Sequence, residues 1–297
     1  MNKQVRYLKG YPGFTYVMSS EAFCFVMHLI DIKYLQDNNY NIFWSQEEYI
    51  ERMGMGKNAF LRCLWELKRI GLLITTKGED GNRVAYTLNM PAYDRLVKVC
   101  GSTYNPQRLK EFLKTIREKG RKVGDITDRE ISFLEGVAGR GGKEASYVKY
   151  YTGFSYLLNP DEICLLMHML DIEFITRYKP DSFQRKEEWL SRTNMDEPVF
   201  NKSVRNLEQL GIIERTTGKD RRPLLILSQY GYDKLVAVCG TTYNYHALKE
   251  FFTWFTQKQK RSINNVLTHE LEALEHYGKN YGAMNFPFPV LPSISRR

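Results

Sequence analysis

The sequence predicts a mainly helical protein with small β-hairpins, an α+β fold built from two similar domains. The chain has 297 residues, more than the roughly 250 residues at which a single hydrophobic core usually stops growing. Segments of the first half recur in the second half at a constant displacement. Within each half, most apolar residues follow helical spacing, and two short runs alternate as strands do.

The internal repeat covers most of the chain. Residues 11–16 (YPGFTY) recur as residues 151–156 (YTGFSY), and residues 27–32 (MHLIDI) recur as residues 167–172 (MHMLDI), both 140 positions later. Beyond residue 90 the displacement becomes 139, because one residue fewer separates the matching segments. The lost residue falls in a predicted surface hairpin, where a change of length is tolerated best.

The repeat also predicts the domain boundaries. The first copy, with a helical extension at its C-terminal end, spans residues 1–135, and the second copy with the matching extension spans residues 147–282. A glycine-rich stretch at residues 136–146 is the predicted linker. The proline-rich tail at residues 283–297 is expected to be disordered and is a candidate docking segment for replication or transcription proteins.

The first two helices of copy one follow from apolar spacing and a capping motif. A helix is predicted over residues 19–35, where apolar residues recur on one face: Phe23, Met27, Ile30 and Tyr34. A short extended piece at residues 41–44 precedes Ser45. Ser45 and Glu48 form a Ser-x-x-Glu capping box, which predicts a second helix that ends near Met53 and Gly54.

A third helix and a hairpin complete the core of each copy. The helix is predicted over residues 57–70 and stops at Gly71, a favoured residue just past a helix end. Its inward face carries Phe60, Leu64 and Leu67. Two strands at residues 72–76 and 83–88 are joined by a polar turn, which predicts a β-hairpin.

Further helices are predicted after each hairpin. Residues 106–119 and 245–260 each form a predicted helix that ends in a basic cluster, at residues 117–122 and 258–261. Such clusters suit DNA, although a helix dipole and solubility favour them equally. Thr127 and Glu130 predict the cap of one more short helix, with an echo at residues 267–277.

Catalytic and metal-binding patterns are missing from the sequence. The five cysteines form no Cys-x-x-Cys pair, and we interpret them as small buried residues. His28 and His168 lie in apolar helices, and we interpret them as core histidines whose rings are oriented by Asp31 and Asp171. The spacing around Lys143 fails the phosphate-binding loop pattern. We therefore expect a non-enzymatic protein without cofactor or metal.

Charge and hydropathy narrow the possible partners. The chain carries a formal net charge of +9, which favours polyanionic partners such as nucleic acid. The sequence has no run of 18 apolar residues and its first residues lack the apolar core of a signal peptide. These observations predict a cytoplasmic protein without membrane contact.

The order of helix, short strand, helix, turn, helix and hairpin, with residues 44–60 (WSQEEYIERMGMGKNAF), resembles the winged helix-turn-helix of bacterial regulators and of plasmid and phage replication proteins. The resemblance covers residues 19–89 of the first copy and the matching segment of the second copy, residues 159–228. It implies double-stranded DNA as the partner. In this family the third helix usually enters the major groove and the hairpin, or wing, contacts the neighbouring backbone.

The candidate DNA-binding residues are the polar side chains that this geometry turns outward. Asparagine and arginine suit adenine and guanine edges, whereas a lysine at a helix start suits phosphate. In copy one they are Lys57, Asn58 and Arg62 on the helix, and Lys77 and Arg83 on the wing. In copy two they are Asn201, Lys202 and Arg205 on the helix, and Arg215, Lys219, Arg221 and Arg222 on the wing.

The two copies differ in these residues, and Glu197 marks the second copy as the weaker reader. We expect different half-sites, with more base reading by copy one and more phosphate anchoring by copy two. Sequence-specific DNA binding as a replication initiator or transcriptional regulator is the leading hypothesis. The alternatives are a protein-interaction scaffold, which an exposed Trp65 would suit, and an ordinary solvated helix face.

Overall fold

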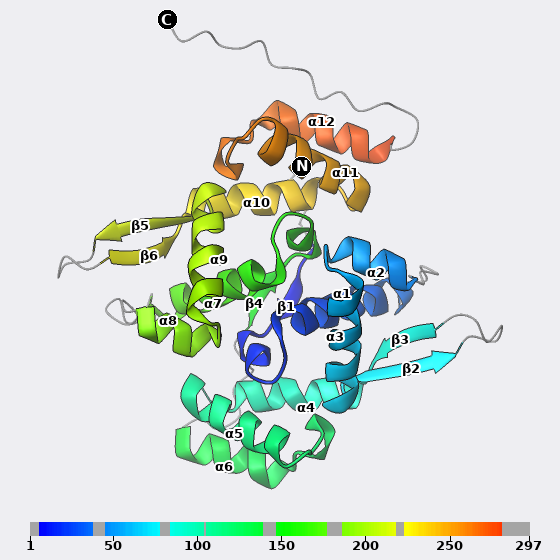
Figure 1. Cartoon of the computed structure of the whole chain (residues 1–297), viewed down its shortest axis with the longest axis vertical. Coiled ribbons are helices and arrows are strands. Elements are labelled where there is room, and N and C mark those ends of the chain that lie inside the picture. The colour runs from blue at the N-terminus through cyan, green and yellow to red at the C-terminus, as the bar shows by residue number, and fades with distance from the viewer. Residues whose placement is uncertain are drawn as a thin grey trace, which may run out of the picture.

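Helices and two-stranded sheets follow one another in the same order in both halves of the chain (Figure 1). A computed structural model describes residues 6–37, 45–77, 84–103, 105–138, 147–176, 186–217 and 223–280. The first half contains β1 (Leu8–Gly10), the 3-10 turn η1 (Pro12–Tyr16), α1 (Ser20–Asp37), α2 (Gln46–Arg52), α3 (Lys57–Arg69), β2 (Leu73–Lys77), β3 (Val84–Leu88), α4 (Met90–Gly101), α5 (Pro106–Glu118), η2 (Val123–Asp125) and α6 (Asp128–Ala138).

The second half repeats this order and differs only near its end. It contains β4 (Val148–Tyr150), η3 (Thr152–Tyr156), α7 (Pro160–Thr176), α8 (Lys186–Thr193), α9 (Glu197–Gln209), β5 (Ile213–Thr217), β6 (Pro223–Leu227), α10 (Gln229–Thr241), α11 (Tyr245–Phe252), the π-helical turn η4 (Thr253–Lys258), η5 (Ile263–Asn265) and α12 (Thr268–Lys279). The prediction of a mainly helical α+β protein with small antiparallel sheets is confirmed.

The capping residues at the start of α2 and the glycine at the end of α3 have the structures that the sequence predicts. The backbone N–H of Glu48 donates to Ser45 Oγ at 3.2 Å, and the backbone N–H of Ser45 donates to Glu48 Oε2 at 2.7 Å. This capping box satisfies two N–H groups at the start of α2. After α3, Gly71 has a φ of 81°, a left-handed conformation that favours glycine and ends the helix.

The two halves are joined by a short antiparallel sheet. β1 pairs with β4, with Leu8 opposite Tyr150, Lys9 opposite Lys149 and Gly10 opposite Val148. Figure 1 looks along an approximate two-fold axis near this sheet, since a half-turn in the plane of the picture brings each half onto the other. The strands were not predicted from the sequence, because three residues are too few to show an alternating pattern.

Helix α1 is buried on all sides along its first half. Residues 22–29 are all buried, because α1 packs against α3 and β3 of its own half and against α7 of the other half. The predicted single apolar face is therefore too narrow. Tyr34, the last residue of the predicted buried face, is not buried. It is 49% exposed and stacks against the Arg6 guanidinium. One continuous hydrophobic core includes residues of both halves.

Two buried histidines cross the junction in a reciprocal way. The hydroxyls of Ser155 and Thr15 each donate to a backbone carbonyl oxygen at 2.8 Å, that of Thr152 and Pro12 respectively. Each hydroxyl oxygen therefore accepts from an imidazole N–H. His28 Nε2 lies 3.0 Å from Ser155 Oγ, and His168 Nε2 lies 2.9 Å from Thr15 Oγ1.

The interpretation of His28 and His168 as core residues is confirmed, because both are fully buried. The predicted partner was wrong. Asp31 forms an ion pair with Arg6 at 2.7 Å, and Asp171 forms one with Arg192. The carboxylates thus hold arginines at the junction, and the rings are oriented by hydroxyl groups of the opposite half.

Several predictions need revision or lie outside the described residues. Helices α4 and α10 were not predicted. The start of the proposed linker, residues 136–138, belongs to α6, and the helix predicted over residues 245–260 gives way to a π-helical turn after Phe252. The rest of the linker, the extended piece at residues 41–44 and the proline-rich tail lie outside the described residues.

A close backbone contact makes Gly231 a sensitive position. A Cβ atom there would lie 1.8 Å from the Gly211 carbonyl oxygen. Alanine is favoured over glycine in a helix by about 1 kcal/mol, so substitution without a clash would stabilise α10. We instead expect Gly231→Ala to lower the free energy of unfolding by about 1–3 kcal/mol, as measured by urea denaturation.

The equivalent position of the first half provides the control for this substitution. Ala92 is buried there and already carries a Cβ atom. Ala92→Gly should cost about 1 kcal/mol through helix propensity and lost packing. An unchanged or higher stability of Gly231→Ala would contradict the contact between α10 and Gly211.

Candidate nucleic-acid interface

Helix α3 has one buried face and one exposed polar face. Phe60, Leu64 and Leu67 are buried, as predicted. Lys57, the first residue of the helix, and the nearby Asn58 and Arg62 are exposed. The exposed face begins at the N-terminal end of α3, where the unsatisfied backbone N–H groups and the helix dipole also favour an anion.

The exposed face of α3 also carries large apolar side chains. Trp65 is 63% exposed and Leu61 is 45% exposed. The guanidinium carbon of Arg69 lies 4.7 Å from the centroid of the Trp65 ring. This face therefore combines positive charge with an aromatic surface, a composition that serves contacts with bases or with a protein.

Helix α9 presents a different surface at the equivalent place. Phe200, Val204 and Leu207 are buried, and Lys202 and Arg205 are exposed. Asn201 is half-buried, and its backbone carbonyl accepts from Arg205 Nε at 3.3 Å.

An ion pair offsets the negative charge at the start of α9. Glu197 pairs with Lys186 of α8. A hydrogen bond from Lys186 lowers the pKa of Glu197, so the carboxylate stays ionised and its charge is matched locally.

Arg215 is the candidate wing residue whose side chain the structure describes. Arg215 of β5 forms a bidentate ion pair with Glu208 of α9, with Nε–Oε1 at 2.5 Å and Nη2–Oε2 at 3.1 Å. Its guanidinium is therefore shared with a carboxylate in the free protein. The side chain of Lys77 and all of Arg83, Lys219, Arg221 and Arg222 lie outside the described residues.

The two candidate surfaces are related by the approximate two-fold axis. Helices α3 and α9 occupy equivalent positions around it in Figure 1, and their hairpins, β2–β3 and β5–β6, extend to opposite sides of the molecule. Because both halves share one core, the spacing of the two helices is set by packing. The sequence alone predicted the residues of each surface but not this arrangement.

The basic clusters after α5 and α11 are partly neutralised. The Arg121 guanidinium donates to Glu130 and to the Asp125 carbonyl, and Arg261 makes the same contacts to Glu270 and Asn265. The hydrogen bond from Arg121 is the main cause that lowers the pKa of Glu130 to about 2. These two arginines therefore fasten the helical extensions, a structural role that accounts for their recurrence.

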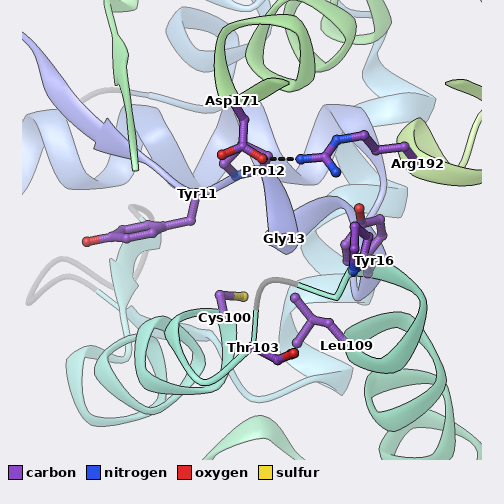
Figure 2. A pocket seen from close by; sticks show the side chains of 10 residues that line it. Tyr11, Pro12, Gly13, Tyr16, Cys100, Thr103, Leu109, Asp171 and Arg192 are labelled. Atoms are coloured by element: carbon purple, nitrogen blue, oxygen red, sulfur yellow. Dashed lines mark hydrogen bonds and ion pairs between the residues drawn. The ribbon is translucent and has the colours of Figure 1, made fainter. Parts of the chain in front are cut away.

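A small pocket between the halves was missed by the sequence analysis. It has a volume of about 50 Å³ and lies between η1, the end of α4 and the start of α5 on one side, and α7 and α8 on the other. Figure 2 shows the Asp171–Arg192 ion pair at its upper edge, with Leu109 and Thr103 below. The repetition of arginine at positions 52 and 192 of two polar helices was the available signal.

Comparison of the chain with protein-family models, curated proteins and solved structures found no match. Over the described residues, no helix combines the length and apolar character needed to cross a membrane.

Proposed function

We propose that this chain binds double-stranded DNA through two winged-helix modules, one in each half, which arose by internal duplication. The main support is the exposed face of α3, where Lys57, Asn58 and Arg62 stand opposite a buried apolar face and precede a hairpin. Helix α9 repeats this arrangement with Lys202 and Arg205. In this proposal α3 and α9 enter the major groove and the hairpins contact the adjacent phosphates.

The junction makes the chain equivalent to a covalently linked dimer. Dimeric helix-turn-helix proteins read half-sites about one helical turn, ~34 Å, apart, and their two-fold axis matches that of the site. Here both reading helices belong to one body with one core. The second half-site is therefore engaged at a high effective concentration once the first is bound.

The two half-sites differ in our proposal. Helix α3 supplies Asn58 and Arg62 for base edges, whereas the start of α9 carries the Lys186–Glu197 ion pair and the half-buried Asn201. Copy one therefore reads bases more than copy two, and copy two anchors phosphates. A replication initiator or transcriptional regulator acting on DNA in the cytoplasm would use such an asymmetric site to fix its orientation.

One observation supports a second candidate function. Trp65 and Leu61 expose apolar area on the same face of α3, and tryptophan is frequent at the centres of protein interfaces. A scaffold that binds a protein partner through α3 would lose that partner in Trp65→Ala. It would tolerate replacement of Lys57 and Arg62 by alanine.

The proposed function is tested by selection from random-sequence duplexes, followed by titration of the selected duplex at several salt concentrations. We expect recovery of two linked, unequal half-sites and an affinity that falls steeply with salt, because bound phosphates release counterions. Failure to bind at low salt, or binding without any enriched sequence, would exclude sequence-specific recognition and leave the scaffold as the better explanation.

A further inference from the structure

The pocket between the halves has an occupied counterpart at the equivalent place. Its walls include Tyr16, Leu109 and Arg192, which correspond in the repeat to Tyr156, Leu248 and Arg52. These three wall residues are the same on both sides of the two-fold axis, whereas Pro12 of the pocket is replaced by Thr152. The first residue of the adjoining helix differs, since α5 begins with Pro106 and α11 begins with Tyr245.

In the second half, the Tyr245 ring lies against these wall residues. Its centroid is 3.8 Å from the Arg52 guanidinium carbon and 5.9 Å from the centroid of the Tyr156 ring. Tyr245 is only 7% exposed, and its hydroxyl donates to Glu51 Oε2 at 3.2 Å. A phenol ring stacked on a guanidinium is a favourable arrangement in a desolvated site.

In the first half, proline replaces this ring, and a pocket of about 50 Å³ lies beside the start of α5. Arg192 lines it and is 5% exposed, with its charge matched by Asp171. A site of this kind binds a neutral ring more readily than a free anion, because the arginine already has a carboxylate partner.

We propose that this pocket binds a small single-ring phenol, which stacks on the Arg192 guanidinium as Tyr245 stacks on Arg52. Leu109 and Pro106 line the pocket and provide the apolar contacts. The pocket is open on one side and smaller than the ~150 Å³ of a closed cavity that admits benzene. The pocket therefore encloses only part of the ring, and the rest lies in solvent.

The size and polarity of the site limit the ligand further. The residue equivalent to Glu51 is Ser191, which is exposed, so a ring substituent at that edge meets no carboxylate. Fused ring systems are too large for the space. The ligand class that copies the Tyr245 ring is a phenol with at most a small para substituent, whose hydroxyl faces solvent, and this inference does not depend on DNA binding by α3 and α9.

The test uses 4-fluorophenol as the probe and follows its fluorine resonance during titration with the full chain. We expect saturable binding with a Kd on the order of 1 mM, typical of a ligand of so few atoms in a partly open site. Competition by p-cresol should displace the probe. Competition by 4-methylcyclohexanol, which has the same shape without an aromatic face, should be at least about tenfold weaker.

Exchanging the residues at positions 106 and 245 tests whether the probe binds in the proposed pocket. Pro106→Tyr should fill the pocket and weaken probe binding at least about tenfold, whereas adding Tyr245→Pro should open the equivalent pocket beside Arg52 and restore it. Both positions start a helix, where proline is well tolerated. Leu109→Trp is a second way to fill the pocket if Pro106→Tyr fails to fold.

One result supports the phenol site, and two results would overturn it. Binding by the wild-type chain that is lost in a folded, filled variant and regained in the exchanged double variant supports the site. Lack of binding by the wild-type chain would overturn the proposal. Equal binding by the wild-type chain and a folded, filled variant would overturn it too.

Discussion

The double substitution Lys57→Glu and Arg62→Glu is expected to weaken binding to the selected duplex by at least about 100-fold near physiological salt. Both side chains are exposed on the face of α3 that we assign to the groove. A phosphate or base contact of this kind contributes about 1–3 kcal/mol, and the reversed charges also repel the backbone. Fluorescence anisotropy with a labelled duplex measures the change.

A matched control separates the face of α3 from the net charge of the chain. Lys114→Glu and Lys279→Glu change the total charge by the same amount at exposed positions of α5 and α12. These helices lie toward opposite ends of the molecule in Figure 1. We expect affinity within about threefold of wild type. Equal losses in both double variants would reduce the interaction to non-specific attraction, and no loss in either would argue against DNA.

Acidification from pH 7.5 to pH 5 is expected to remove several kcal/mol of folding stability. Burial is the largest cause that lowers the pKa of His28 to about 3, and it places the pKa of His168 well below its ordinary value of 6.5. The folded chain keeps both rings neutral, whereas the unfolded chain protonates them below about pH 6.5. Stability is therefore complete above that pH and falls toward pH 3.

The expected loss at pH 5 is about 2 kcal/mol for each histidine, or about 4 kcal/mol together. Urea denaturation at both pH values measures it. Burial raises the pKa of Asp31 and Glu162, which acts in the opposite direction at the acid end of this range. The double variant His28→Gln and His168→Gln isolates the imidazoles, because its stability should change far less between the two pH values. An equally steep change in this variant would contradict the assignment.

Local features of the fold could be predicted from the sequence because neighbouring residues determine them. The cap at Ser45, the helix end at Gly71 and the buried face of α3 depend on spacing within a few residues. The outward position of Lys57 and Arg62 follows from the same periodicity. These elements carry the proposed interface, so its residues were within reach of sequence analysis.

The junction between the halves was not predictable in the same way. Residues 22–29 are apolar on every face of α1 except at His28. Apolar spacing therefore could not indicate which face packs against α7. The hydroxyls of Thr15 and Ser155 meet a histidine more than a hundred residues away. The pocket beside Arg192 also combines segments from both halves, and no local pattern brings such segments together.

The placement of the two-fold axis within a single chain frees equivalent positions to change one at a time. In an assembly of two identical chains, a substitution near the axis is always made twice, and both copies must tolerate it. Here Thr15 and Ser155 serve the same histidine contact with different residues, and proline stands at position 106 where the other half has Tyr245. One side of the molecule can thus acquire a new property while the other side maintains the fold.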